Sequence, residues 1–136
     1  MQEIYLTSTF TNPWNVSFNP RIGEALAKAG LSCHLPQKAT QHDARATIFS
    51  NDIKGINASR CILAVALNES PNWGAEVGYA YGLKKPVIAL TDQAHQLPLI
   101  CEGMITETFK AKNLDDIDSY INDLAAVLKK HTSKIN

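Results

Sequence analysis

Short apolar runs alternate along the chain with longer segments in which apolar residues recur every three or four positions. A short apolar run is typical of a strand buried in a sheet, and a period near 3.6 residues is typical of a helix with one buried face. The apolar runs predict strands over residues 3–8, 31–35, 61–67, 86–91 and 104–109. The periodic segments predict helices over residues 19–30, 43–56, 73–84 and 114–131.

Local signals mark both ends of the first predicted helix. Asn19 has a side chain that can cap a helix start, and Pro20 suits the first helical position, where no N–H is needed. Gly30 suits the exit of the helix. The sequence therefore predicts that this helix begins at Asn19, after a polar loop.

Strands that alternate with helices predict right-handed β-α-β crossovers. The expected fold class is α/β, a Rossmann-like or flavodoxin-like three-layer sandwich with a five-stranded, mostly parallel sheet. The 136 residues suffice for a hydrophobic core, and we expect a single domain over residues 1–136. Such sheets bind small ligands beyond the carboxyl ends of their strands, which here means the loops at residues 7–14, 68–73 and 92–98.

The charge balance narrows the classes of partner. Thirteen basic and thirteen acidic side chains cancel, and neither sign forms a block. This pattern argues against a nucleic-acid polymer or a membrane surface as partner, because both need a basic face. A small nucleoside or nucleotide remains possible. The apolar runs are also far shorter than the roughly 18 residues that a membrane span needs.

The cysteines and histidines indicate neither a disulfide framework nor a metal site. Cys33, Cys61 and Cys101 are odd in number and widely spaced, so we interpret them as core thiols in a reducing compartment. No secretion signal precedes them, which favours a cytoplasmic protein. The four histidines have no ligand spacing with the cysteines, and no glycine-rich phosphate loop is present. We therefore expect no metal and no cofactor.

Glu76 is a carboxylate among unusually small neighbours, in the stretch 74-GAEVGYA-80. The spacing predicts that it lies in the first turn of its helix, where the free N–H groups and the helix dipole favour the charged form. A glutamate there is either an ordinary helix-start residue or a reactive group. The small neighbours and the adjacent strand end favour the second interpretation.

Asp52 and Tyr5 are two further candidates. On a helix, Asp52 shares a face with Phe49, Ile53 and Ile56, so it points toward the edge of the core and needs a partner or a purpose. It either hydrogen-bonds a nearby loop or belongs to a site. Tyr5 lies in the middle of a predicted strand, where a tyrosine is usually a core residue with its hydroxyl at the rim.

Aromatic residues flank the loops at the expected site. Phe10 and Trp14 follow the first strand, and Trp73 precedes the helix that contains Glu76. Aromatic side chains in loops either cover the core or stack on a flat heterocycle. Ser70 and Asn72, beside Trp73, are ordinary turn residues by their spacing alone.

Three stretches together resemble the nucleoside 2-deoxyribosyltransferase family. They are 4-IYLTSTF-10, 49-FSNDIKGINASRCILAV-65 and 74-GAEVGYAYGLKKPVIAL-90. The resemblance implies that Glu76 is the nucleophile, that Tyr5 orients it, that Asp52 is the acid near the departing base, and that Phe10 walls the base pocket. It also directs attention to further substrate contacts at Thr7, Ser70, Asn72, Trp73 and Gly74.

The chain departs from the family pattern at two places. Ser70 stands where the transferases usually have a base-binding aspartate, and it looks more like the related 2′-deoxynucleoside 5′-phosphate N-hydrolases. The segment 95-HQLPLIC-101 lacks the asparagine-leucine-methionine run that a neighbouring subunit donates in the transferases. For a phosphate, Arg21 and Arg45 are the candidate arginines near the strand ends.

Three functions follow from the resemblance. The leading hypothesis is an enzyme that transfers 2-deoxyribose between nucleobases through a covalent Glu76 intermediate. The alternative is a hydrolase of 2′-deoxynucleoside or nucleoside 5′-monophosphates, and the third is a non-catalytic nucleotide-binding module. The expected partners are a nucleoside or nucleotide and a free nucleobase. The resemblance also implies a homo-oligomer with shared active sites, for which residues 97–100 form a candidate apolar patch.

Overall fold

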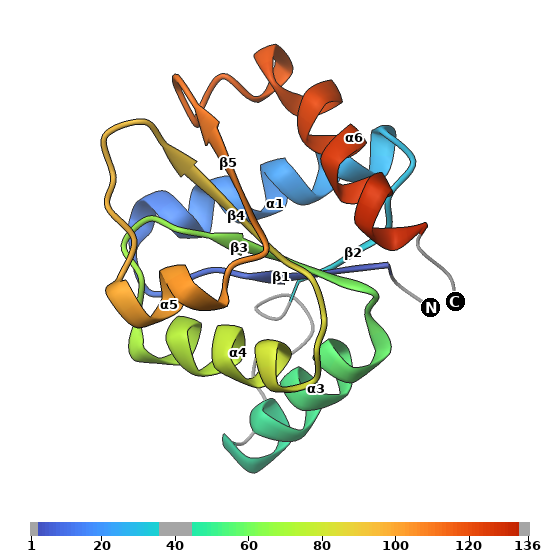
Figure 1. Ribbon diagram of the computed structural model, residues 1–136, viewed down its shortest axis with the longest axis vertical. Helices are drawn as coiled ribbons and strands as arrows, with labels where there is room; N and C mark the ends of the chain where they lie inside the picture. Colours follow the sequence, from blue (N-terminus) through green and yellow to red (C-terminus); the bar gives the residue numbers. More distant parts are fainter. Residues whose placement is uncertain (1–2, 36–44, 134–136) are drawn as a thin grey trace.

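The protein forms a five-stranded parallel sheet with helices on both faces (Figure 1). The structure, a computed structural model, describes residues 3–35 and 45–133. The strand order is β2-β1-β3-β4-β5, and every neighbouring pair is parallel. The strands are β1 (Ile4–Thr7), β2 (Cys33–His34), β3 (Cys61–Val65), β4 (Val87–Asp92) and β5 (Glu107–Ala111). The predicted α/β sandwich is confirmed, with a sheet that is wholly parallel rather than mostly so.

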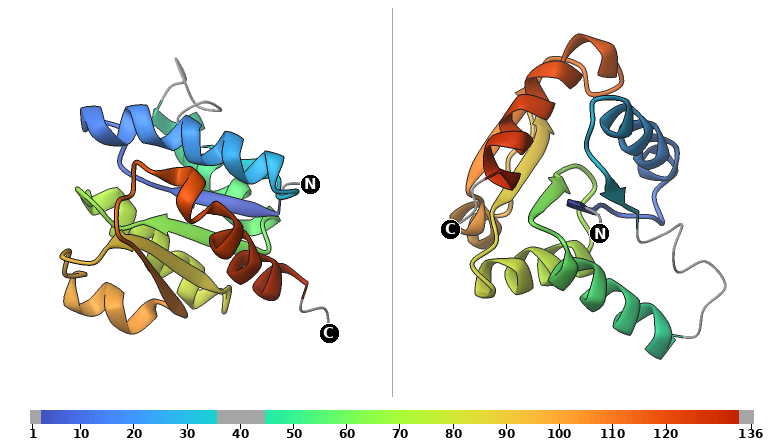
Figure 2. Two further views of the ribbon diagram at one scale, coloured as in Figure 1. Left: turned by 90° about the horizontal axis from the view of Figure 1, so that it is seen from above. Right: turned by 90° about the vertical axis from the view of Figure 1, so that its right-hand side faces the viewer.

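Five α-helices and one 3₁₀-helix connect the described strands. They are α1 (Pro13–Lys28), α3 (Arg45–Ala58), α4 (Pro71–Gly82), α5 (Leu99–Met104), η1 (Ile117–Ser119) and α6 (Ile121–Thr132). Helices α1 and α6 cover one face of the sheet, and α3, α4 and α5 cover the other (Figure 2). Among these helices none is long and apolar enough to span a bilayer.

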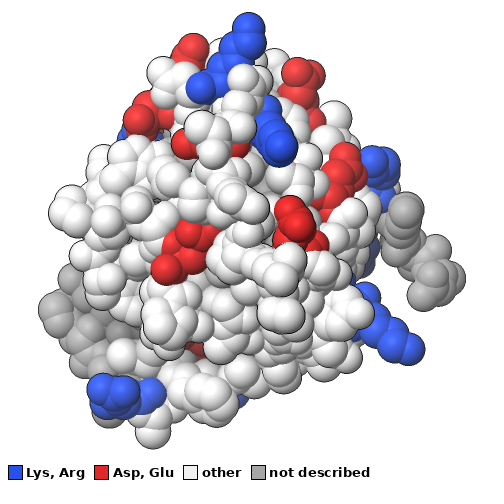
Figure 3. Space-filling model, turned by 60° about the vertical axis from the view of Figure 1, so that its left-hand side comes forward, with Lys and Arg blue, Asp and Glu red and all other residues white. Residues whose placement is uncertain are grey.

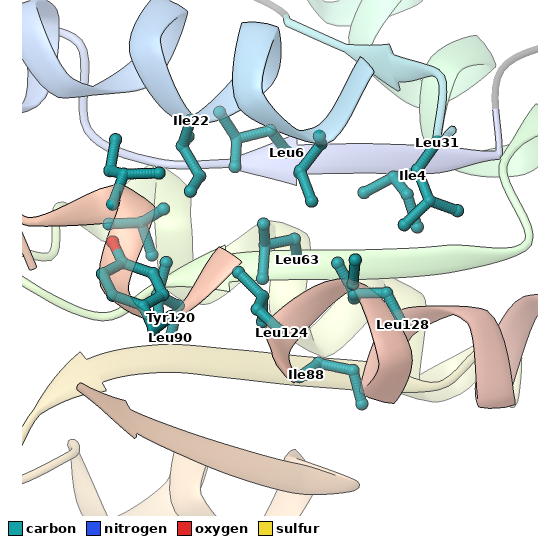
Figure 4. Close-up of a cluster of buried hydrophobic side chains, with 14 of the residues drawn as sticks. Ile4, Leu6, Ile22, Leu31, Leu63, Ile88, Leu90, Tyr120, Leu124 and Leu128 are labelled. Atoms are coloured by element: carbon teal, nitrogen blue, oxygen red, sulfur yellow. The ribbon is translucent and has the colours of Figure 1, made fainter. Parts of the chain in front are cut away.

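The two faces of the sheet have different cores. Large aliphatic residues such as Leu63 and Val65 face α1 and α6, and Figure 4 shows part of this cluster. The opposite face presents small residues, among them Ala64, Ala66 and Ala89, and this is the face where α4 and its buried Trp73 pack. Side chains alternate between faces along a strand, so one stretch of sequence supplies both cores.

The strand order reverses between β1 and β3, and two loops meet there. This is the place where open parallel sheets bind ligands. A buried amide joins the loops: Asn15 Nδ2 donates to Ser8 Oγ and to the Leu67 carbonyl oxygen, each at 3.1 Å. Asn68 Nδ2 donates in turn to Asn15 Oδ1 at 3.1 Å. The loops after β1 and β3 are therefore held as one unit.

The cap of helix α1 lies seven residues earlier than predicted. Asn12, not Asn19, is its cap, because the Asn12 side chain accepts a hydrogen bond from the Trp14 backbone N–H at 3.0 Å, and Pro13 takes the first helical position. Asn19 is fully buried inside the helix and donates through Nδ2 to the Thr9 carbonyl oxygen at 3.2 Å. Both Asn-Pro pairs carry the same start signal, and packing selects the first.

The packing that extends α1 is aromatic. Trp14 was expected in a loop, but it lies in α1 and stacks on Phe18 with ring centroids 4.5 Å apart. Phe18 and Ile22 are completely buried in the core. Burial of these rings outweighs the cost of Pro20, which lies inside the helix, removes one backbone hydrogen bond and remains exposed.

Other element boundaries also differ from the prediction. Helix α5 was not predicted, because its six residues are too few to show a period. The last predicted helix is divided at Tyr120 into η1 and α6. Residues 43 and 44 of the second predicted helix lie outside the described part of the chain. Of the three free cysteines only Cys61 is buried, whereas Cys33 and Cys101 are partly exposed.

Replacement of the proline inside α1 is expected to stabilise the protein. Pro20→Ala restores a backbone N–H to the middle of α1, so we expect the free energy of unfolding to rise by about 1–3 kcal/mol in urea titrations. Pro13→Ala is the matched control, since an N–H at the first helical position gains no partner. Equal effects of the two substitutions would contradict the position of α1.

Candidate active site

A cavity of about 710 Å³ opens between α3, α4 and the loop after β1. Its size suits a ligand of a few hundred daltons. The residues that line it come from three elements: Thr7, Ser8 and Phe10 from β1 and its loop, Arg45, Ile48, Phe49, Asp52, Ile53 and Ile56 from α3, and Ser70, Asn72, Trp73, Ala75, Glu76 and Tyr79 from α4 and its cap. Most of the lining surface is apolar, although more than half of the fifteen lining residues carry a polar or charged group.

The Glu76 carboxylate is held at both oxygens by hydroxyl groups of β1. Tyr5 Oη donates to Oε2 at 2.9 Å, and Thr7 Oγ1 donates to Oε1 at 2.7 Å. Tyr5 and Thr7 are two residues apart on a strand, so their side chains project from the same face of the sheet. The carboxylate is thus fixed in orientation at the wall of the cavity.

Asp52 brings a second carboxyl group to the same place from α3. Its Oδ1 atom is buried and has no hydrogen-bond partner among the residues that the structure describes. Asp52 lies close enough to Tyr5 and Glu76 for its charge to raise the pKa of both. The structure therefore brings Tyr5, Asp52 and Glu76 together, although they are far apart in the sequence.

Burial changes the titration of both carboxyl groups. It raises the pKa of Glu76 to about 7, and the charge of Asp52 adds to this, while the hydrogen bonds from Thr7 and Tyr5 oppose it. Burial also raises the pKa of Asp52 to about 6, against the effect of Tyr5. The pKa of Tyr5 is raised by burial and by the two carboxylates, so its hydroxyl stays a donor. Near neutral pH the two acids therefore share about one proton.

Glu76 does not lie in the first turn of its helix, contrary to the prediction. It is the sixth residue of α4, whose cap is Ser70: the Ser70 hydroxyl accepts a hydrogen bond from the Trp73 backbone N–H at 3.2 Å. The free N–H groups at the helix start are a turn away from the carboxylate. Burial and the two hydroxyl groups set its ionisation instead.

The predicted aromatic residues take different positions around the cavity. Phe10, with 41% of its surface exposed, lies in the loop after β1 and lines the cavity. Trp73 was expected in a loop but lies in α4 and is 2% exposed. Phe49 was expected on the apolar side of its helix, yet it is 69% exposed at the cavity rim. Aromatic rings therefore occur both at the rim and at the inner wall.

The remaining predicted contacts divide into two groups. Ser70 and Asn72 line the cavity at the start of α4. Gly74 does not, because its open side faces α5, where an added Cβ would lie 3.8 Å from Cys101 Sγ. The predicted site loop at residues 92–98 also supplies no lining residue; its His95 Nε2 instead contacts Glu69 Oε2 at 2.7 Å.

A family model matches most of this chain. The model of the nucleoside 2-deoxyribosyltransferase family matches residues 4–114, which include both carboxyl groups and the whole cavity lining. The chain belongs to this family. The resemblance noted in its sequence is confirmed, and the family's substrates are nucleosides and nucleobases. Among curated proteins, none matches the sequence of this chain.

Solved structures share the fold of this deoxyribosyltransferase-family protein. A 2-deoxyribosyltransferase from Bacillus psychrosaccharolyticus has 19% identity and a TM-score of 0.73, over 90% of this chain and 95% of that one. A conserved protein from Enterococcus faecalis has 18% identity and a TM-score of 0.75, over 96% and 98%. A CMP N-glycosidase from Clostridium botulinum has 14% identity and a TM-score of 0.67, over 90% and 98%. At such identities the likeness concerns the fold.

Tyr79 was missed by the sequence analysis, although a signal for it exists. It lies one turn after Glu76 on α4, so counting a helical turn outward from the carboxylate would have found it, and its hydroxyl donates to Asn57 Oδ1 of α3 at 2.9 Å. Arg45, one of the two arginines named from the sequence, lies two turns before Asp52 on α3 and is the one cation among the described lining residues. Arg21, the other arginine considered, instead contacts Asp115 at 3.3 Å.

Charged side chains of both signs are dispersed over one face of the protein. On the face shown in Figure 3, basic and acidic side chains are scattered among uncharged ones, without a broad basic area in the part of the chain that is described. Within the described ranges, no three His, Cys, Asp or Glu side chains converge as a metal ion requires. The groups available for chemistry are therefore the two carboxyls and the hydroxyls beside them.

The raised pKa of Glu76 makes the stability of the protein depend on pH. The folded protein binds this proton more tightly than the unfolded chain, whose pKa is near 4.5, so the stabilisation is complete at low pH and is lost as pH rises toward 7. We expect Glu76→Gln to remove most of a decline of about 3 kcal/mol between pH 5 and pH 8, measured by urea unfolding. The exposed Glu24→Gln should leave the decline unchanged; equal slopes for both variants would refute the linkage.

Proposed function

We propose that this protein cleaves the N-glycosidic bond of 2′-deoxynucleosides and transfers the deoxyribose to another nucleobase, with Glu76 as the nucleophile. The observation that supports this most directly is the Glu76 carboxylate, held by two hydroxyls at the wall of an apolar cavity with a second carboxyl beside it. A nucleophile must be oriented and only weakly solvated, and this carboxylate is both.

The proposed reaction has two displacements. A Glu76 oxygen forms a bond to the anomeric carbon C1′ while the C1′–N bond breaks, and the electron pair of that bond leaves with the base. Asp52 donates its proton to the departing base. A nitrogen of the second base then attacks C1′, the bond to Glu76 breaks, and Asp52 takes up the proton that the incoming base releases.

The titration of the two acids makes the reactive form a minor one. The first step needs an ionised Glu76 and a protonated Asp52, whereas the pKa values of about 7 and about 6 place the shared proton mainly on Glu76. The reactive arrangement is therefore about a tenth of the one-proton form. The Tyr5 hydroxyl stays protonated and therefore continues to orient Glu76. Both required states are accessible within a narrow range around pH 6–7.

The cavity suits a flat heterocycle attached to a sugar. Phe10 and Phe49 lie at its rim and Trp73 at its inner wall, and such rings stack on nucleobases. The volume of about 710 Å³ accommodates a nucleoside. Ser70 and Asn72 offer polar contacts at the end of the cavity formed by the start of α4.

Hydrolysis of a nucleoside 5′-monophosphate is the second candidate. It would use the same Glu76 intermediate, with water in place of the second base. Two observations favour it: Ser70 stands where the transferases usually have an aspartate, and Arg45 adds a cation to the cavity lining. An arginine and a serine at a helix start are suitable partners for a phosphate group.

The expected oligomer and location also belong to this proposal. Leu99 and Ile100 of α5 are 81% and 70% exposed, and a second copy of the chain would cover them. We propose a cytoplasmic homo-oligomer whose neighbouring chains complete each cavity. Sedimentation of a monomer only would contradict the shared site.

A product assay tests the reaction. The protein is incubated with a deoxynucleoside and a second free base, and separately with a deoxynucleoside 5′-monophosphate, and the products are separated by chromatography. A new deoxynucleoside is the expected result. Glu76→Ala should reduce turnover by at least about a thousandfold, because the nucleophile is lost, while the exposed Glu24→Ala should retain it.

Other products would change the proposal. Free deoxyribose 5-phosphate from the monophosphate would favour the hydrolase. A ligand that raises the melting temperature without any turnover would favour a non-catalytic nucleotide-binding module. Full activity of Glu76→Ala would remove Glu76 from the mechanism.

The acid role of Asp52 is testable through the pH profile. For the wild type we expect kcat/KM to rise as Glu76 ionises and to fall as Asp52 loses its proton, with a maximum between about pH 6 and pH 7. Asp52→Asn should lower the maximum by about 10²–10⁴ and abolish the alkaline limb. The acid limb that remains should report the titration of Glu76 alone.

The exposed Asp118→Asn is the control and should reproduce the wild-type profile. An Asp52→Asn profile that keeps its alkaline limb, with only KM changed, would assign Asp52 to binding rather than to proton transfer.

A further inference from the structure

Gly55 occupies the closest contact between α3 and the sheet. An added Cβ would lie 2.8 Å from Tyr5 Cε2, 2.9 Å from Tyr5 Cδ2 and 3.0 Å from His34 Cδ2. Distances this short are not tolerated between a Cβ and another carbon, so any larger residue forces a ring or the helix to move. The site therefore depends on the absence of a side chain at position 55.

The two rings beneath Gly55 form one rigid surface. Tyr5 of β1 and His34 of β2 are paired in register, and their rings stack with centroids 5.2 Å apart and an angle of 14°. Tyr5 is completely buried, and its hydroxyl is bound to Glu76 at 2.9 Å. The Tyr5 ring cannot yield to an extra carbon without altering that hydrogen bond.

The glycine is unfavourable for the helix itself. Inside a helix, glycine costs about 1 kcal/mol relative to alanine. Gly82, the last residue of α4, serves as the comparison, because an added Cβ there would meet nothing within 4 Å. The local cost at Gly55 is therefore offset by something outside the helix, and the close contact with Tyr5 and His34 is the feature that distinguishes it from Gly82.

We propose that Gly55 is a positioning residue for the two carboxyl groups. It lets α3 rest directly on the Tyr5 and His34 rings, which keeps the Tyr5 hydroxyl on Glu76. Asp52 lies one turn before Gly55 on the same helix, so the same contact sets how closely Asp52 approaches that hydroxyl. This inference rests on the proposed function for its catalytic meaning, but its geometry is independent of it.

A side chain at position 55 has two ways to be accommodated, and both disturb the site. If the Tyr5 ring moves, Glu76 loses a hydrogen bond to its carboxylate. If α3 moves outward, Asp52 moves away from Tyr5 and Glu76. The titratable groups around Glu76 are Tyr5 of β1 and Asp52 of α3, with His34 of β2 behind the Tyr5 ring.

Gly55→Ala tests the proposal by two measurements. The first is the titration of the Glu76 side-chain carboxyl by ¹³C NMR, which needs no substrate. If the Tyr5 ring moves, loss of its hydrogen bond is expected to move the Glu76 midpoint to higher pH, because that bond lowers the pKa of Glu76. If α3 moves outward, the midpoint is expected to move to lower pH, because the charge of Asp52 raises the pKa of Glu76 less from a greater distance. A shift in either direction supports the proposal. The second is kcat in the product assay, which should fall at least about tenfold with a smaller change in KM.

Matched variants separate positioning from general damage. Gly82→Ala introduces the same methyl group on α4 without a contact and should leave both the Glu76 titration and kcat unchanged. In a Tyr5→Phe background, which already lacks the hydroxyl, Gly55→Ala should add little to an upward shift. If Gly55→Ala alone does not fold, addition of His34→Ala gives the Tyr5 ring room, and the double variant is compared with His34→Ala.

The Glu76 titration and the product assay can fail independently, so the positioning role of Gly55 and the proposed enzymatic function are tested separately. An unchanged Glu76 titration in folded Gly55→Ala, or the same shift in Gly82→Ala, overturns the positioning role. A shifted titration in a protein whose wild type turns over neither deoxynucleosides nor monophosphates supports the positioning role and contradicts the enzymatic function.

Discussion

The site depends on two hydroxyl groups of one short strand that hold a buried carboxylate of a distant helix. Tyr5 and Thr7 each bind one oxygen of Glu76 and so join β1 to α4 through the cavity wall. Burial of a carboxylate without hydrogen-bond partners would be unfavourable. The two hydroxyls offset part of this unfavourable free energy, and the raised pKa of Glu76 reflects the remainder. Orientation and partial desolvation of the acid therefore have the same structural origin.

The sheet is built to allow this arrangement. On the α4 side, the sheet presents short side chains, those of Ala64, Ala66 and Ala89, so that the helix with Glu76 and Trp73 can pack close to the strands. On the other side, large aliphatic residues fill the space beneath α1 and α6. Most of the hydrophobic stabilisation thus lies on the face away from the cavity, and the cavity face can contain polar groups.

Much of the fold and part of the site could be predicted from the sequence. Apolar runs and helical periods identify the parallel sheet, and the three family-like stretches identify Glu76, Asp52 and Tyr5 as residues that belong together. The remainder depends on contacts between distant segments. The Asn12-Pro13 and Asn19-Pro20 pairs are equivalent locally, and only the stacking of Trp14 on Phe18 decides between them. Likewise, nothing near Gly55 in the sequence indicates that two rings lie beneath it.

The amide of Asn15 has a consequence for how the cavity can change its size. This buried group is hydrogen-bonded to Ser8, Leu67 and Asn68 at once. The loops that follow β1 and β3 therefore cannot separate without breaking hydrogen bonds of the Asn15 amide. Helix α3 is held differently: Ile56 is its one buried residue among those described, and its contacts to Tyr5 at Gly55 and to Tyr79 at Asn57 lie near its C-terminal end. The strand-end loops therefore form a firmly held wall of the cavity, and the N-terminal half of α3, which contains none of these contacts, forms a less firmly held one.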